Sequence, residues 1–324
     1  MNAYTIRPAV AADTPAILAA FAQTFPSRRS REEWEWLYRH NPDGSQGMLC
    51  IAADGRLAAH CGASLHRLRR DGEILVIGQN RDAFSHPAHR AVQAGRGGLF
   101  VKTARALFET WGAEQGVNFY YGFPSPRHLR LGEKLLDYRA GRNWGRYRFD
   151  TRQPLPPLGA ASGRVANITT FDAEFDRLDQ ARPQPLAIVH DSRFLGWRFA
   201  PRGGRRYWVW GFYPHLSGKL AGYVVFAPSA GRAALVDFHF PVAPRDYRSF
   251  WALIVAKLRW QGVTDIETWY SHHHPDHRKL LDLGFAALPL PEHTAFCFRL
   301  YPQSPSLDEL DQRFSFTMAD CDLH

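Results

Sequence analysis

Alternating apolar and polar positions on either side of short turns form the first recurring pattern in this 324-residue chain. Residues 49–65 alternate around Asp54-Gly55, and residues 206–228 alternate around Ser217-Gly218. Glycine takes the positive φ that tight turns need, so each pattern predicts a β-hairpin. The two hairpins lie far apart in the sequence, and both are part of a longer repeated pattern.

The repeat continues through a strand, a polar turn and a short helix. Gly116-Val117 begins an apolar strand, and the following helix ends in Lys-Leu-Leu-Asp at residues 134–137. Gly262-Val263 begins the same pattern, which ends in Lys-Leu-Leu-Asp at residues 279–282. Similar segments around Trp36 and Trp197 precede the two hairpins. Matching segments in the same order indicate a duplication.

A Pro-, Gly- and Ala-rich stretch separates the two copies. Residues 153–163 have the composition of a linker. We therefore predict an N-terminal domain over residues 1–150, a linker over 151–166, a C-terminal domain over 167–301 and a tail over 302–324.

Only the first copy contains a glycine-rich turn between its central strand and the next helix. The strand over residues 73–85 ends before Pro87, and apolar spacing predicts a helix from about Gly98 to Ala113. Bare backbone N–H groups and the helix dipole favour a diphosphate at such a helix start. Arg90 and Arg96 are placed to pair with phosphate oxygens. The turn consists of Gln93, Ala94, Gly95, Arg96, Gly97 and Gly98.

The second copy lacks this turn, since no glycine lies between Pro241 and the helix after it. A diphosphate there would meet side chains in place of bare amides. We therefore expect the second copy to be free of cofactor and to serve the substrate pocket or the fold.

Composition and charge add limits to this picture. Apolar residues make up 45% and charged residues 22%, as in ordinary soluble globular proteins. No apolar run reaches the ~20 residues of a membrane-spanning helix, and we expect no secretory signal. The four cysteines form no CxxC pair, which favours reduced thiols in the cytoplasm. The net charge of +9 favours anionic partners in general.

Three segments resemble the GNAT acetyltransferases. Residues 5–9 with the following helix resemble their opening strand and helix, and residues 82–87 with 95–100 look like their acetyl-CoA motif. Residues 119–125 resemble the next strand and helix start. The resemblance covers residues 4 to about 149 and extends faintly over 167–300. The spacing of Arg90 from Gly95 departs from the family pattern.

This resemblance implies an α/β fold with a mixed sheet, built as two tandem GNAT-like domains. It implies an acetyl-CoA-dependent N-acetyltransferase that moves an acetyl group to a primary amine of a small molecule by direct attack, without a metal. It places the thioester against Phe84 and Ser85, where a free backbone N–H stabilises the oxyanion. The implied acetyl-CoA residues are Phe84, Ser85, His86, Arg90, Gln93, Ala94, Gly95, Arg96, Gly97 and Gly98.

Catalysis by direct attack needs proton transfer as well as a bound thioester. Asp82, on the strand that would carry the thioester, is the first candidate for the general base. The general acid is expected from the next strand and helix, with Tyr121 and Ser125 as leading candidates and Tyr120 and His128 as alternatives. His272-His273-His274 is interpreted as a polar turn and not as a metal site. Adjacent side chains on a strand point to opposite faces, so these histidines cannot all bind one ion.

Two other functions are compatible with the same patterns. One is a Fem-type aminoacyltransferase, which also uses two GNAT-like copies and takes aminoacyl-tRNA. The glycine-rich turn favours CoA over that alternative, so nucleic acid is not the expected partner. The other is an acyl-CoA-binding protein without catalytic activity. The sequence does not identify the acceptor amine.

Overall fold

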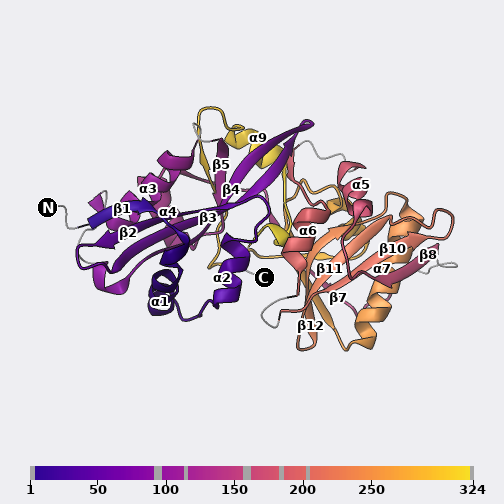
Figure 1. The fold of residues 1–324 in the computed structure, drawn as a ribbon. Helices are drawn as coiled ribbons and strands as arrows, with labels where there is room; N and C mark the ends of the chain where they lie inside the picture. The colour runs from indigo at the N-terminus through magenta and orange to yellow at the C-terminus, as the bar shows by residue number, and fades with distance from the viewer. Residues whose placement is uncertain are drawn as a thin grey trace. The chain divides into compact units, whose positions relative to one another are not determined.

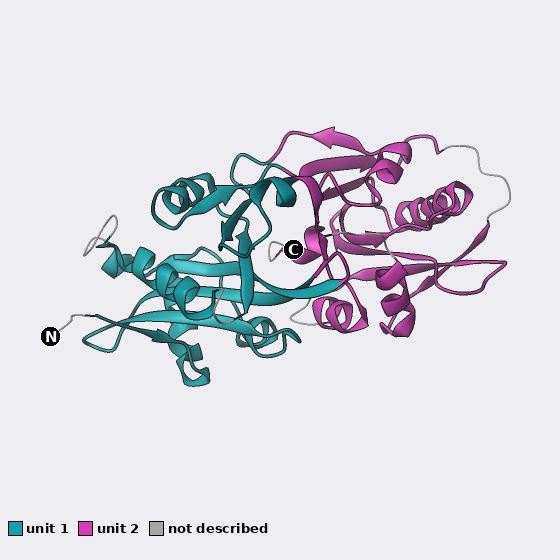
Figure 2. Ribbon diagram, turned by 90° about the horizontal axis from the view of Figure 1, so that it is seen from above, with its two compact units in different colours: residues 1–68, 73–142, 291–311 teal, residues 69–72, 143–290, 312–324 magenta. Residues whose placement is uncertain are grey.

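In the computed structural model, the described residues are 4–90, 97–112, 116–155, 162–181, 186–201 and 205–321. They form two compact units, each built on its own mixed sheet (Figures 1 and 2). The first unit comprises residues 1–68, 73–142 and 291–311, and the second comprises residues 69–72, 143–290 and 312–324. The expected fold class, α/β with mixed sheets, is confirmed.

The sheet of the first unit follows the order β1-β2-β3-β4-β5-β15-β6, in which β4 and β5 are parallel neighbours. The strands are β1 (Tyr4–Pro8), β2 (Ser45–Ala52), β3 (Leu57–Arg70), β4 (Glu73–Ser85), β5 (Val117–Gly122), β6 (Tyr138–Ala140) and β15 (Cys297–Leu300). The helices are α1 (Thr14–Thr24), α2 (Arg31–Tyr38), α3 (Leu99–Trp111) and α4 (Pro126–Leu135), with short 3-10 turns at Ala11–Asp13 and Pro87–His89.

Helices cover both faces of this sheet. The apolar side of α3, including Val101 and Leu107, packs in one cluster with Tyr120 of β5. The apolar side of α1, including Phe21, packs in a separate cluster with Phe84 of β4. Each helix buries its apolar stripe against the sheet, which contributes about 25 cal/mol per Å² of apolar surface removed from water. The central strand β4 is therefore buried on both sides, and its side chains reach two different environments.

The second unit repeats this arrangement with the strand order β14-β7-β13-β12-β11-β10-β8, and β12 and β13 are again parallel neighbours. Its strands are β7 (Gly145–Asp150), β8 (Gly163–Asn167), β10 (Trp208–Pro214), β11 (Gly222–Ser229), β12 (Arg232–His239), β13 (Asp265–Tyr270) and β14 (Ala286–Leu288). Its helices are α5 (Ala173–Ala181), α6 (Ser192–Phe199), α7 (Pro244–Trp260) and α8 (His277–Asp282).

Two strands are exchanged between the halves of the chain. β7 pairs with β13 and β14 of the second sheet, although the sequence boundaries place it at the end of the first domain. β15 pairs with β5 and β6 of the first sheet, although those boundaries place it in the second domain. Local patterning specifies that a segment is a strand but does not specify which sheet edge it joins. The compact units therefore differ from the contiguous ranges 1–150 and 167–301.

The C-terminal residues, expected as a tail over 302–324, are an integral part of the fold as far as Cys321. They form α9 (Leu307–Arg313), β16 (Phe314–Ser315) and a 3-10 turn, η5 (Met318–Asp320). β16 pairs in parallel with β9 (Leu186–Ile188), and residues 314–321 are all buried. Across the described ranges, no helix combines the length and apolar character needed to cross a bilayer.

Candidate active site

Strand β4 continues for six residues past the end of its pairing with β5. The two strands pair at Val76–Val117, Gly78–Tyr120 and Gln79–Tyr121, and the register ends there. Asp82 has a φ of 49°, a conformation that interrupts the regular extension of β4. Beyond this point β4 stays with β3, because the His86 N–H donates to the Ala58 carbonyl at 2.9 Å. Backbone N–H groups alternate sides along a strand, so the Ser85 N–H points to the edge that β5 has left.

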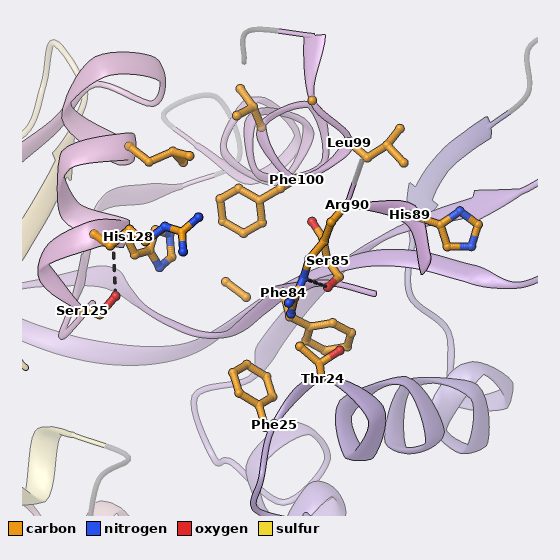
Figure 3. A pocket seen from close by; sticks show the side chains of 15 residues that line it. Thr24, Phe25, Phe84, Ser85, His89, Arg90, Leu99, Phe100, Ser125 and His128 are labelled. Atoms are coloured by element: carbon orange, nitrogen blue, oxygen red, sulfur yellow. Dashed lines mark hydrogen bonds between the residues drawn. The ribbon is translucent and has the colours of Figure 1, made fainter. Parts of the chain in front are cut away.

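A cavity of about 450 Å³ lies beside this divergence. Figure 3 shows Phe25, Phe84 and Phe100 pointing toward it from α1, β4 and α3. The polar side chains around it come from the end of α1, from the end of β4 and the segment after it, and from the start of α4. The lining residues are Thr24, Phe25, Ala83, Phe84, Ser85, His89, Arg90, Gly98, Leu99, Phe100, Val101, Ser125, Arg127, His128 and Leu131.

Helix α3 begins at this cavity, and no side chain in the described part of the chain caps its first turn. Gly98 is the N-cap residue and makes no side-chain cap hydrogen bond. Gly97 does not have a positive φ, and a Cβ placed on it would meet no atom within 4 Å. Neither backbone conformation nor packing among the described residues therefore requires glycine at 97. The amides of a helix's first turn have no partner within the helix, so they suit a ligand that approaches the backbone closely, and an anion above all.

The other residues expected to bind acetyl-CoA do not all line the cavity. Phe84, Ser85, Arg90 and Gly98 line the cavity. His86 is not a lining residue: its Nδ1 accepts from the Ala88 N–H at 3.2 Å, and its Nε2 lies 2.7 Å from the Gln23 side-chain oxygen. His86 therefore holds the corner after β4. Gln93, Ala94, Gly95 and Arg96 lie outside the described residues.

The start of α4 contributes Ser125 and His128 to the cavity. Ser125 is the N-cap, and its Oγ accepts from the His128 backbone N–H at 3.3 Å (Figure 3). The His128 ring lies edge-on to Phe100, with 5.1 Å between ring centroids. Its Nε2 is buried and has no hydrogen-bond partner in the described part of the chain. Burial lowers the pKa of His128, so the imidazole is neutral at pH 7.

Asp82 and Tyr121, two of the expected catalytic residues, are not among the residues that line this cavity. The Asp82 carboxylate accepts from Arg29 Nη2 at 2.7 Å and from the Tyr38 hydroxyl at 2.9 Å. Tyr121 is fully buried. The alternative acid Tyr120 is also buried, and its hydroxyl donates to Gln46 at 2.6 Å. Of the candidates for the general acid and the general base, Ser125 and His128 line the cavity.

The second unit has a carboxylate in the position that corresponds to Asp82. Asp237 lies on β12 shortly before Pro241, as Asp82 lies on β4 shortly before Pro87. Asp237 is fully buried and accepts from the Tyr223 hydroxyl at 2.9 Å. A buried, hydrogen-bonded carboxylate in both copies, one of which lacks the glycine-rich turn, favours a structural role for Asp82.

The divergence of β12 and β13 in the second unit is filled by the chain itself. Pairing ends at Ala234–Glu267, and the 3-10 turn η5 lies against both strands. The Thr317 hydroxyl donates to Asp237 at 3.1 Å, and the Phe316 carbonyl accepts from the Ser271 N–H at 3.1 Å. Helix α7 starts after Ala243 with a proline at its first turn. In the first unit, the divergence opens onto the cavity described above, and the helix that follows starts at a glycine.

Three solved structures have a similar fold. A conserved protein from Enterococcus faecalis V583, described as a probable N-acyltransferase, matches with a TM-score of 0.71 and 16% identity over 92% of this chain and 72% of that one. GCN5-related N-acetyltransferases from Kribbella flavida and Anabaena variabilis match with TM-scores of 0.68 and 0.67 at 14% and 12% identity. Each match covers 92% of this chain, together with 71% of the Kribbella flavida chain and 72% of the Anabaena variabilis chain. No family model and no curated protein matches the sequence.

These likenesses show the fold of the chain. It has the fold of the GCN5-related N-acetyltransferases, and the expected arrangement of two GNAT-like domains agrees with the two sheets and their repeated element order.

Proposed function

We propose that this chain, which has the GNAT fold, is an acyltransferase that moves an acyl group from a CoA thioester to a primary amine of a small molecule. The observation that carries the proposal is the cavity at the β4–β5 divergence, which meets the uncapped, glycine-initiated start of α3. Acetyl is the simplest acyl group, and acetyl-CoA is the donor we expect.

The residues present fit such a donor. The amides of Gly97 and Gly98 would hold the diphosphate, with the Arg90 guanidinium beside it. Phe25, Phe100 and Ala83 offer an apolar wall for the uncharged arm of the molecule. The thioester supplies an activated carbonyl, and the Ser85 N–H is oriented to stabilise negative charge on that oxygen.

His128 is our candidate for proton transfer. An attacking amine must be neutral, and a departing thiolate needs a proton. The neutral imidazole can accept a proton from the amine and return it to the thiolate. Its Nε2 lacks a partner within the described ranges, so that nitrogen is available as a donor or as an acceptor. Ser125 sets the helix start that holds the ring in place.

Replacing His128 with asparagine should lower kcat by about 10²–10⁴, the usual contribution of a positioned acid or base. The lowered pKa means that wild-type kcat/KM should rise with pH below about 6.5 and then level off. The variant should lose this rise. Steady-state rates between pH 5 and 8 measure both effects. His215→Asn is the matched control, because His215 is exposed on the second unit. A variant rate within twofold of wild type would exclude His128.

Thermal shift and turnover separate the competing functions. Acetyl-CoA should raise the melting temperature, and an acetylated product should form on a panel of primary amines. Stabilisation by tRNA without stabilisation by acetyl-CoA would favour a Fem-type aminoacyltransferase. Binding of acetyl-CoA without turnover on the whole panel would favour a non-catalytic acyl-CoA-binding protein.

A further inference from the structure

Arg81 and Gln79 lie side by side within the first unit. A Cβ on Gly78 would collide with the Tyr120 ring, which belongs to the cluster under α3. Successive strand residues point to opposite faces, so Gln79 and Arg81 face the side covered by α1 and α2. Arg81 Nη2 donates to the Gln79 side-chain oxygen. The two residues are 5% and 1% exposed.

Several hydrogen-bond donors of this pair are not used. Arg81 Nε and Nη1 and Gln79 Nε2 are buried and have no partner among the residues described. The Ser64 hydroxyl, on the neighbouring strand β3, is also buried and has no hydrogen-bond partner among the residues described. Ser64 faces the same side, since it alternates in step with His60, whose ring lies 5.5 Å from Trp34 of α2. Buried polar atoms in folded proteins are nearly all hydrogen-bonded, so this group needs an explanation.

The local charge is also unbalanced. The Asp82 carboxylate accepts from Arg29 and Tyr38. Asp82, Arg29 and Arg81 all act electrostatically on the buried Tyr38 hydroxyl, so two guanidinium groups stand near one carboxylate. Buried charges in proteins are normally paired, because an isolated charge loses its hydration. Among the residues that the structure describes, no carboxylate pairs with Arg81, and this gap and the unused donors both call for an anion.

We propose that Arg81, with Gln79 and Ser64, binds a carboxylate of the acceptor substrate. This inference rests on the proposed acyltransferase function and specifies its acceptor as an amine that carries a carboxylate. Arg81 precedes the cavity residue Ala83 by two positions in β4. We therefore expect an acceptor in which only a few bonds separate the carboxylate from the reacting nitrogen. The planar guanidinium matches a carboxylate with two parallel hydrogen bonds.

Two substitutions near the same carboxylate should have opposite effects on the ligand-free protein. Arg81→Met removes an unpaired buried charge at similar length, and it should raise the melting temperature by about 2 °C or more. Arg29→Met is the matched control: it leaves Asp82 buried without its ion pair and should lower the melting temperature. A lower melting temperature for Arg81→Met would show that Arg81 has a structural partner, and would overturn the proposal.

Anion binding provides the second readout. N-acetylglycine, which has the carboxylate of the expected product class, should stabilise the wild-type protein, and neutral N-acetylglycinamide should not. Arg81→Met should lose the difference between the two. Equal responses to both probes, or stabilisation by inorganic phosphate alone, would overturn a carboxylate site. Titration of the wild-type protein with acetyl-CoA tests the proposed function separately: acetyl-CoA binding without a carboxylate response would refute the acceptor site alone.

Discussion

Replacing Gly97 with glutamate should weaken acetyl-CoA binding by more than 100-fold, about 2.7 kcal/mol. The side chain would put a carboxylate at the uncapped start of α3, where the proposal places the diphosphate. The substitution should be tolerated by the fold, because Gly97 is exposed and a Cβ there meets no atom within 4 Å. Lost binding with unchanged stability is therefore the expected result, measured by isothermal titration and thermal melting.

Gly196→Glu is the matched control for this prediction. Gly196 lies in α6 of the second unit, and a Cβ there also meets no atom within 4 Å. The control variant should bind acetyl-CoA as the wild type does. Retained affinity in Gly97→Glu would mean that the diphosphate does not bind at the start of α3.

Replacing His190 with leucine should destabilise the second unit by about 3–5 kcal/mol. The imidazole lies between two fully buried carboxylates, 3.1 Å from Asp237 and 2.8 Å from Asp320. Its removal leaves both without their shared cation and releases residues 314–321 from β12. Chemical denaturation measures the loss. His215→Leu, at an exposed position, should change stability by less than about 0.5 kcal/mol. A similar small effect for His190→Leu would show that this cluster does not hold the C-terminal segment.

The same cluster predicts a pH dependence. Burial lowers the pKa of His190, but Asp237 and Asp320 outweigh it and hold the pKa well above the usual 6.5. A group whose pKa is raised by folding contributes its full stabilisation below the unfolded pKa and loses it as the pH rises through the folded pKa. The second unit should therefore lose stability as the pH increases above about 6.5. His190→Leu should lack this dependence.

The sequence was sufficient for features that depend on local pattern. The turn residues, the repeat and the glycine-initiated helix all depend on neighbours within a few positions, and the repeated order of elements is present in both units. The exchange of β7 and β15 was not predictable, because a strand pattern is compatible with either sheet edge. The buried C-terminal segment was missed for a related reason: its apolar residues 314, 316 and 318 indicate burial, but not against which strands.

The expected site residues divide in the same way. Phe84, Ser85 and Gly98 follow from the strand and the helix start, and they line the cavity. The sequence shows that Asp82 is a carboxylate on the strand beside the expected thioester, but its partner Arg29 lies 53 positions away in the sequence. Such a pairing depends on how α1 and α2 pack, which no local pattern shows.

Two aromatic residues of the cavity were not identified as site residues. Phe25 follows α1 directly, and Phe100 is the second residue of α3. The position of Phe100 next to the glycine turn was the available signal, because a residue in the first turn of α3 lies beside any ligand bound at that helix start.

Isothermal titration of the wild-type chain with acetyl-CoA tests the central claim most directly. One molecule should bind per chain, because the first unit has the cavity and the open helix start, while residues 314–321 fill the equivalent place in the second unit. An absence of binding would contradict the acyltransferase proposal, and two molecules per chain would contradict the assignment of the site to the first unit alone.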